Sequence, residues 1–600
     1  MFKRFLRSFV LNYPAFFCLV TTLGAQVPYT ITTVGPDSDG LLRFDLALPT
    51  MHQSDSFSDA VWIFAKYRLK QHTDTLLVSK VQGQSVFFNN VKSLPQPGAG
   101  VGFLGSDPNA PSLYVVSTHK NYVVLNKAPV FKPNKNPIML AYNPWRHASL
   151  APNGHLFPSH WSAHSSIDQK GIMLAPLSGI SIPVNLNNVC LQLVPELQKK
   201  ALNNEIELQL FAIPMVHAQE GPFWIGGTGD ERGAFFRYPN RTQAYQIESE
   251  SSLIMAKDHG RLWGRSEQGD DQVGAEGRVP ESYPKGFASF YCMKYELTQG
   301  LYRDFLNSLP RHQQEQRVLM SWKPGNYVGG FVWEGESWSE TAQTDLLFPK
   351  NRIGIRLICM PPHGAPTTFA CDLTPSPPPF KDVNQAHDGA WHAMGQLSWM
   401  DLAAFLDWAA LRPMTETEFE KVARGPLHPS PNELAHGSKQ VFSPQKLINP
   451  LQVTEQTDSL CNVVCCNPPF VMGMTRVGST QNRGPRMHNG ASFYGAYDLS
   501  GNAWERVVSL SHLQGRTFTG AHGDGLLSVQ GHANTPFWPG LVQGQVTGAN
   551  GSAFRGGSWY VGTPFLRISD RVYGHAACIE RFSVRGGRGV RTANSLLISN

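Results

Sequence analysis

The chain has 600 residues, of which 41% are hydrophobic and 16% are charged, which indicates a globular protein long enough for several domains. The formal net charge is +6 and no basic run stands out, so the charge gives no argument for nucleic-acid binding. The 55 glycines and 44 prolines predict many turns and loops.

The first 25 residues have the pattern of a secretory signal peptide. Lys3, Arg4 and Arg7 precede a mostly apolar run over residues 9–23, and Gly24 and Ala25 supply the small residues of a cleavage site. An uncleaved anchor is the alternative, although the run is short for a membrane span. We expect cleavage after Ala25, no membrane span in the mature chain, and a periplasmic, outer-membrane-associated or extracellular location.

The cysteines bear on this expectation because an exported protein can oxidise them. Of the nine cysteines, Cys18 lies in the predicted signal, which leaves eight in the mature chain. These eight cysteines could form disulfides or remain buried free thiols, and the sequence cannot assign a pairing.

Residues 26–205 are expected to form a β-rich, sandwich-like domain. Short apolar or alternating runs recur and are separated by Pro, Gly, Asn and Asp, a spacing typical of all-β modules. The runs cover residues 41–48, 60–69, 75–81, 112–118, 138–142, 171–176 and 189–194.

From residue 206 onward the sequence pattern changes and predicts loops with a few helices. An apolar face at helical spacing follows Thr298. A second helix is predicted to begin after Ser398, with Asp401 three residues on, and a third after Thr415, which forms a capping box with Glu418.

Six segments in a fixed order then point to a known family. They are FYCMKYELTQGLYRDFLN (290–307), QLSW (396–399), LRPMTETEFEKVARG (411–425), YGAYDLSGNAWE (494–505), FRGGSW (554–559) and RGGRGVR (585–591). In this order they resemble the motifs of the formylglycine-generating enzyme/sulfatase-modifying factor family. The resemblance implies an α+β fold related to C-type lectins for residues 206–600.

The resemblance also bears on catalysis. Active members of the family carry two cysteines just after the RGGS strand, which bind copper and oxidise a substrate cysteine to formylglycine. Those places hold Val561 and Leu566 here. A related branch uses iron held by a helical N-terminal domain, whereas this N-terminal region is β-rich. We therefore expect no catalytic residue at these places and neither copper nor iron.

Two other sites follow from the resemblance. A structural calcium ion is implied at Asp498, Gly501, Ala503 and Glu505, because two carboxylates around a Gly-Asn turn, completed by two backbone carbonyls, can wrap a hard cation. Alternatively, the two carboxylates satisfy turn amides and Arg506. The segment that lines the peptide groove in active members would place Ser558, Trp559, Arg567 and Arg571 on a binding surface, where the arginines act as a ligand clamp or as an ionic brace.

Together these features favour an exported, non-catalytic binding or envelope-assembly protein with a protein or peptide partner. Some members of the family that it resembles are structural components of secretion and gliding machinery in the bacterial envelope. The alternative is a formylglycine-generating or other metal-dependent oxidase with a changed active site.

Overall fold

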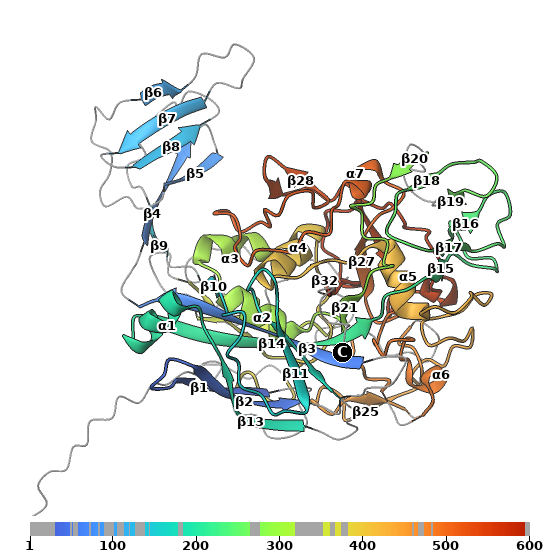
Figure 1. Ribbon diagram of the computed structural model, residues 1–600, viewed down its shortest axis with the longest axis horizontal. Helices are drawn as coiled ribbons and strands as arrows, with labels where there is room; N and C mark the ends of the chain where they lie inside the picture. Colours follow the sequence, from blue (N-terminus) through green and yellow to red (C-terminus); the bar gives the residue numbers. More distant parts are fainter. Residues whose placement is uncertain are drawn as a thin grey trace, which may run out of the picture.

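The computed structural model describes most of the chain and shows strands, short helices and long loops (Figure 1). The described residues are 30–48, 51, 58–70, 74–81, 84–88, 101–104, 113–118, 121–125, 138–142, 145–177, 184–264, 276–318, 352–359, 366–373, 382–458, 461–465, 473–481 and 484–593. The predicted signal peptide lies outside these residues. None of the described helices has the length and hydropathy needed to cross a bilayer.

One eight-stranded sheet runs through the centre of the molecule. Its order is β11-β12-β3-β14-β21-β32-β24, and β10 also pairs with β3. All its printed pairings are antiparallel. In that order the strands are Trp161–Ser165, Ile172–Pro176, Ser58–Leu69, Ile206–Ala218, Phe290–Met293, Gly589–Thr592 and Arg412–Pro413, with β10 at Arg146–Ala148.

Strand β3 is buried on both faces, which explains its unbroken apolar sequence. Val61 and Ile63 face one hydrophobic core, whereas Trp62 and Phe64 face another. Side chains alternate between the two faces of a strand, so a strand covered on both sides reads as a continuous apolar run. Strand β14 pairs with β3 from Ile206 to His217 and divides its side chains in the same way.

A three-stranded sheet covers the first face and forms the sandwich predicted from the sequence. Strands β1 (Thr30–Pro36), β2 (Leu42–Leu48) and β13 (Val184–Leu191) pair in the order β1-β2-β13. Alternate residues of β2, from Leu42 to Leu48, are buried against β3. Helix α1 (Pro195–Leu202) adds Leu197 and Ala201 to the same core.

Two further small sheets are inserted between β3 and β10. In Figure 1 they stand apart from the rest of the protein. Their orders are β5-β4-β9 and β6-β7-β8. In chain order these strands are Asp74–Val81, Gln84–Phe88, Val101–Leu104, Leu113–Thr118, Asn121–Leu125 and Ile138–Tyr142.

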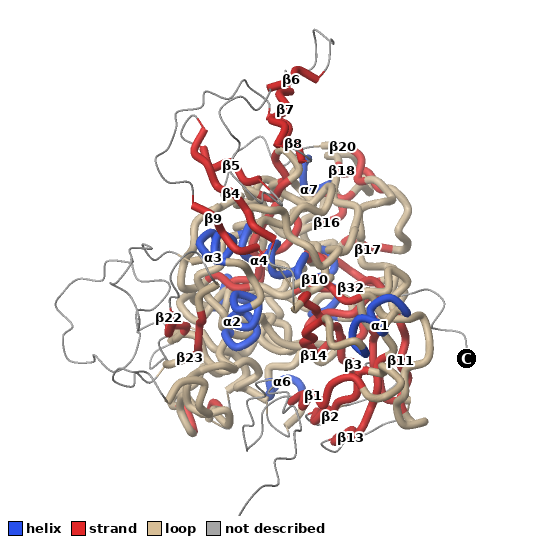
Figure 2. Tube along the Cα trace, turned by 90° about the vertical axis from the view of Figure 1, so that its left-hand side faces the viewer, coloured by secondary structure: helices blue, strands red, loops and turns tan. Residues whose placement is uncertain are grey.

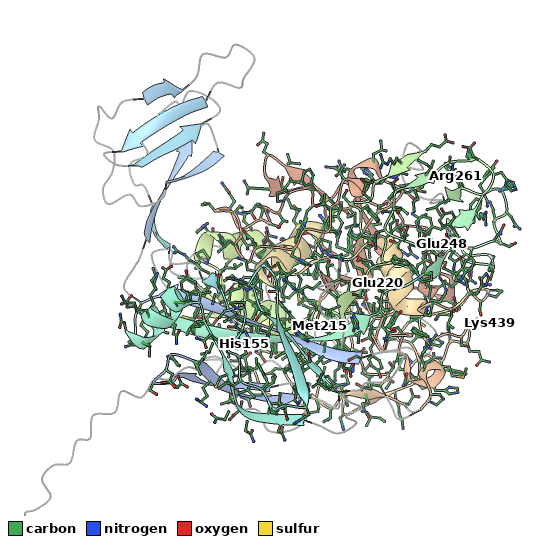
Figure 3. All side chains as sticks on the ribbon, viewed as in Figure 1. His155, Met215, Glu220, Glu248, Arg261 and Lys439 are labelled. Carbon is green, nitrogen blue, oxygen red and sulfur yellow. The ribbon has the colours of Figure 1, made fainter. Side chains whose placement is uncertain are left out.

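Helices cover the second face of the central sheet (Figures 1 and 2). Trp408, at the end of α4, meets Phe64 of β3 edge-on at 5.4 Å between ring centroids and Phe211 of β14 at 4.8 Å. Met215 of β14, labelled in Figure 3, lies fully buried in this core. In chain order the helices after α1 among the described residues are α2 (Gln299–Asn307), α3 (Arg311–Arg317), α4 (Trp399–Trp408), α5 (Glu416–Arg424), α6 (Arg486–Asn489) and α7 (Leu513–Arg516). Of these, α2 and α4 contribute side chains to this core.

Loops tied by short strand pairs make up much of the remainder. The pairings are β15-β17, β16-β19-β18-β20, β22-β23, β25-β26, β30-β27-β31 and β28-β29. Strands β15 to β20 are Phe223–Ile225, Phe236–Arg237, Tyr245–Ile247, Leu253–Met255, Leu262–Trp263 and Gly277–Val279. Strands β22, β23 and β25 to β31 are Ile355–Cys359, Thr368–Cys371, Leu447–Ile448, Gln456–Thr457, Trp504–Val508, Leu541–Val542, Gln545–Val546, Ser552–Arg555 and Arg585–Gly586. The α+β class predicted from the sequence is confirmed.

The three helix starts predicted from the sequence are also confirmed. Thr298 caps α2, and Ser398 and Thr415 form capping boxes at α4 and α5 with Asp401 and Glu418. The predicted boundary at residue 206 stays a prediction: β14 begins there, but it pairs with β3, so the central sheet runs across this position. The cysteines with free thiols include Cys190, Cys292, Cys359, Cys371, Cys461 and Cys578.

Candidate functional site

The Gly-Asn turn of the predicted calcium site leads into β27, which pairs with β30 and β31. Gly501 has φ +89°, and a Cβ there would lie 2.3 Å from the carbonyl oxygen of Val464, so only glycine fits. Asp498 and Asn502 also have positive φ, of 63° and 54°. The turn is therefore tight, and it brings Asp498, Gly501, Ala503 and Glu505 into one small region.

Asp498 is buried, and its carboxylate accepts a hydrogen bond from the amide of Gly478 at 2.6 Å. Burial raises the pKa of Asp498 to about 6. This hydrogen bond comes from a neutral amide, and the nearby charges of Arg588 and Arg476 oppose the upward shift of the Asp498 pKa.

Glu505 is held differently, because Arg588 donates from Nε to both of its carboxylate oxygens at 2.7 and 2.9 Å. Both side chains are fully buried. Burial raises the pKa of Glu505, and the charge of Arg588 opposes that shift. The alternative foreseen from the sequence named Arg506 as the partner, but Arg506 instead donates to the carbonyls of Leu397, Cys578 and Glu580.

A third carboxylate, Glu296, was not singled out from the sequence as a site residue. It accepts from Nδ2 of Asn502 at 2.6 Å and from the amide of Ala503 at 2.8 Å. Burial raises its pKa well above the usual range, and the charges of Asp498 and Glu505 add to the shift. The sequence signal that could have identified Glu296 was its place in the first family motif, directly after Lys294 and Tyr295.

These contacts determine which of the three carboxylates is available to bind a cation. Glu296, Asp498 and Glu505 carry three negative charges when ionised, and Arg588 directly pairs with one of them. A cation would favour the ionised form of Asp498, whereas Glu505 is already paired with the guanidinium of Arg588. Among the described residues, no group of three or more His, Cys, Asp or Glu side chains is arranged to hold a metal. A hard cation here would therefore rely on backbone carbonyls beside Asp498.

The structure corrects most of the predicted binding surface. Ser558 and Arg571 are fully buried, and Trp559 is 3% exposed. Arg571 donates from Nε to Glu416 at 2.8 Å, and its guanidinium stacks on the ring of Phe235 at 3.8 Å. Arg571 is therefore an ionic brace, and these three side chains cannot contact a partner while the protein keeps this fold.

Arg567 is partly exposed in this segment, with 13% of its side chain accessible. Its Nη1 donates to Asp230 at 3.1 Å, and the Asp230 side chain is 76% exposed. Tyr560, which follows the buried Trp559, is 56% exposed. The surface available to a partner in this segment therefore includes Tyr560, Arg567 and Asp230.

The two places that hold cysteines in active members of the resembled family lie in an apolar cluster. Leu566 is fully buried with Leu434, Val463 and Cys465, and Val561 packs against the same cluster. The sulfur of Cys578 accepts from Arg585 Nη1 at 2.7 Å and lies 2.9 Å from Glu580 Oε2.

Among the comparisons with known proteins, the match to a family model agrees with the ordered motifs. No curated protein matches the chain. A solved structure, that of Treponema denticola variable protein 1, matches at 12% sequence identity and covers 64% of this chain and 96% of its own, with a TM-score of 0.27. The family model for the FGE-sulfatase, or sulfatase-modifying factor enzyme 1-like, domain matches residues 263–595, which is more than half of the chain. The chain therefore belongs to the sulfatase-modifying factor family.

Proposed function

We propose that this protein is an exported, non-catalytic binding or envelope-assembly protein that uses its family domain as a rigid scaffold. One observation carries the proposal: Val561 and Leu566 stand where active members have their two cysteines, and both belong to a hydrophobic cluster. Hydrocarbon side chains offer no atom that can bind copper, whereas the thiolates they replace are soft ligands suited to cuprous ions.

The surroundings of these two residues support the same conclusion. Leu566 is fully buried, and its aliphatic side chain packs among the other apolar side chains of this cluster. A buried leucine contributes stability through its apolar contacts. The segment is thus built for stability, and its function in our proposal is to present neighbouring loops to a protein or peptide.

We place the partner-binding surface at Tyr560, Arg567 and Asp230. An exposed tyrosine and an arginine held by one exposed carboxylate combine apolar area with directional hydrogen bonding, and both residue types are frequent in binding hot spots. Export rests on the signal-like residues 1–25, and the envelope is the expected setting of the partner.

A structural calcium ion at the Gly-Asn turn is a second element of the proposal. The buried carboxylate of Asp498 supports it, because among the described residues its hydrogen-bond donor is the neutral amide of Gly478. Such an ion would offset the negative charge of Asp498 when this carboxylate is ionised. The ion would stabilise the folded protein, since the turn lies among buried residues.

The test of the non-catalytic role is metal content and oxygen uptake. The mature protein should contain no stoichiometric copper or iron after exposure to either metal, and it should consume no oxygen with a cysteine-containing peptide. A Val561→Cys/Leu566→Cys double variant is the matched comparison, because it restores two thiols at the places in question. Redox-active metal together with peptide oxidation in the unaltered protein would overturn the proposal.

The partner surface can be tested by photo-crosslinking in the native envelope. A photoreactive residue at position 560 should give a discrete crosslinked species, and Arg567→Ala should reduce its yield. The same residue at position 202, where Leu202 is 49% exposed on α1, serves as the control. Equal crosslinking from both positions would contradict the assignment of the surface.

The calcium site is tested by thermal unfolding with calcium and with a chelator. Asp498→Asn should lower the melting temperature relative to the unaltered protein only in calcium, because ligand binding stabilises the folded state alone. An equal loss in both conditions would show that Asp498 acts only through its hydrogen bond to Gly478.

A further inference from the structure

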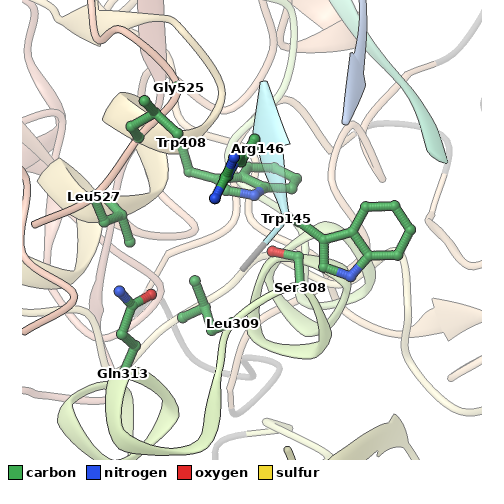
Figure 4. Close-up of a pocket in the computed structure, with 9 residues that line it drawn as sticks. Trp145, Arg146, Ser308, Leu309, Gln313, Trp408, Gly525 and Leu527 are labelled. Atoms are coloured by element: carbon green, nitrogen blue, oxygen red, sulfur yellow. The ribbon is translucent and has the colours of Figure 1, made fainter. Parts of the chain in front are cut away.

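A cavity of about 330 Å³ beside β10 has mostly apolar walls, which include Trp145, Leu309 and Leu527 (Figure 4). Arg146, which also lines it, is engaged in an interaction of its own and is therefore not a free cation for a ligand. Unpaired positive charge lies instead on an exposed surface beside β16 and β19, at the edge of the molecule in Figure 1.

Two turns form this surface and bring its arginines together. In the first turn, the amide of Arg237 donates to the carbonyl of Gln243 at 2.8 Å. The second turn is tied to the first, because the amide of Gly260 donates to the carbonyl of Tyr238 at 2.8 Å. A Cβ at Gly260 would lie 3.5 Å from Nη2 of Arg237, so this guanidinium lies over the second turn, next to Arg261.

The surface, defined by residues 237–243 and 257–261, has more cations than carboxylates. Its exposed basic side chains are Arg237, Arg241, Lys257 and Arg261. The acidic side chains beside them are Asp258 and Glu248, which are also exposed. Among the described residues, none of the three guanidinium groups forms an ion pair or a hydrogen bond. Their planar donors are therefore available to an anionic ligand.

Polar and aromatic side chains accompany the arginines. Asn240 and Thr242 are exposed, and the Thr242 hydroxyl donates to Oδ1 of Asn240 at 2.9 Å. Tyr245 is half-buried, and burial raises its pKa. The charges of Arg261 and Arg237 oppose that shift and the charge of Glu248 adds to it, so all three groups lie near the phenol. The surface thus offers hydroxyl and amide groups beside its cations.

The same part of the chain lacks what insertion into a membrane would need. No large hydrophobic side chain is exposed within residues 203–264, all of which the structure describes. Proteins that lie on a bilayer bury an apolar face in it in addition to their electrostatic attraction to anionic lipids. A hydrophilic anion suits this surface better than a lipid does.

We propose that residues 237–243 and 257–261 bind a carboxylated polysaccharide. Guanidinium groups and carboxylates form charge-assisted hydrogen bonds, and sugar hydroxyls can bond to polar side chains such as those of Asn240 and Thr242. A polymer repeats its charge, so it can engage several of these cations at once. The site extends beyond the proposed function, because it uses neither Tyr560, Arg567 nor the Gly-Asn turn.

Binding of fluorescently labelled carboxymethyl dextran to the full-length protein tests the proposal. Unmodified dextran, which has the same backbone without the charge, should bind at least about ten-fold more weakly. Polyglutamate, which has carboxylates without hydroxyls, should also bind more weakly. The affinity for carboxymethyl dextran should fall as the salt concentration rises toward about 0.15 M, because exposed charges are screened.

Three outcomes of these measurements would overturn the proposal. Equal binding of dextran and carboxymethyl dextran would show that the charge is not recognised. Binding of polyglutamate as tight as that of carboxymethyl dextran would show that the sugar is not recognised. Binding to vesicles of phosphatidylglycerol but not to carboxymethyl dextran would identify the ligand as a membrane.

Two double variants then locate the site. Arg237→Gln/Arg261→Gln should weaken binding of carboxymethyl dextran at least about ten-fold, with an unchanged melting temperature because both side chains are exposed. Lys199→Gln/Lys439→Gln removes the same charge from exposed positions elsewhere, of which Lys439 is labelled with Arg261 in Figure 3, and should bind as the unaltered protein does. Equal losses in the two double variants, or no loss in the arginine variant, would contradict the assignment.

Discussion

The Nε atom of Arg588 donates to both carboxylate oxygens of Glu505, and both side chains are fully buried. The other nitrogens of the same guanidinium donate to the carbonyls of Met293, Lys294 and Tyr497 at 3.0, 3.2 and 2.7 Å. Arg588 thus joins the end of β21, the Gly-Asn turn and the C-terminal segment through one side chain.

Replacement of Arg588 by methionine should destabilise the protein strongly. The change leaves Glu505 buried without its cation, and breaking a buried pair in this way costs about 3–5 kcal/mol. Urea unfolding at neutral pH measures the loss. Adding Glu505→Gln to Arg588→Met should recover part of it, because the stranded charge is then removed. Arg278→Met, in an exposed pair with Glu281, is the control and should change stability by less than about 0.5 kcal/mol.

Asp407 should make stability fall as the pH rises toward neutrality. Burial raises its pKa to about 7, while the nearby charge of Asp524 raises it further and that of Lys66 opposes the shift. Between its unfolded pKa near 4 and its folded pKa, the folded state holds a proton that the unfolded state has released. The free energy of unfolding therefore decreases with pH in this window, by at most about 1.4 kcal/mol per pH unit, and levels off above pH 7.

Comparison with Asp407→Asn isolates this contribution. Asparagine does not titrate, so unfolding curves at pH 5 and pH 7.5 should differ less for the variant than for the unaltered protein. Asparagine can still accept one of the two amide hydrogen bonds, from Asp524 or from Asn534. Identical pH dependence in the two proteins would show that Asp407 is not the group responsible.

Gly525 should be far less tolerant of alanine than Gly544. Both have positive φ, of +84° and +78°, so both variants carry the left-handed backbone cost of about 1–2 kcal/mol. A Cβ at Gly525 would lie 2.3 Å from Nδ1 of His147, whereas nothing lies within 4 Å of one at Gly544. The extra crowding at Gly525 should add about 1–3 kcal/mol in chemical denaturation, and equal losses would show that the His147 contact relaxes freely.

Thr415→Ala should destabilise the protein by about 1 kcal/mol or somewhat more, because the hydroxyl caps α5 at the amide of Glu418. Thr415→Ser keeps the hydroxyl and should recover most of the stability. Guanidinium unfolding of the three proteins gives the comparison. A serine variant as unstable as the alanine variant would show that the methyl group, and not the cap, matters at this position.

Local signals allowed much of the fold to be predicted. The caps at Ser398 and Thr415 depend on residues three positions apart, and the apolar run around Trp62 marks a strand by itself. The six ordered motifs identified the family for the same reason, since each is a short contiguous segment.

The candidate site was less predictable, because its side chains meet across long separations. Arg588 and Glu505 are 83 positions apart, and Glu296 and Asn502 are 206 apart. Arg571 was placed on a surface by its residue type, yet Glu416, 155 positions away, compensates its charge in the interior. No local pattern distinguishes an arginine buried with such a partner from an exposed one.

The central sheet has a practical consequence for anyone who divides this protein. Strand β14 begins at the predicted boundary but pairs with β3 from Ile206 to His217, and β3 supplies one wall of each core. A fragment that starts at residue 206 would therefore expose an unpaired strand edge and the apolar row that normally meets the sandwich. Exposed edges of this kind promote aggregation, so the two halves should be expressed as one polypeptide.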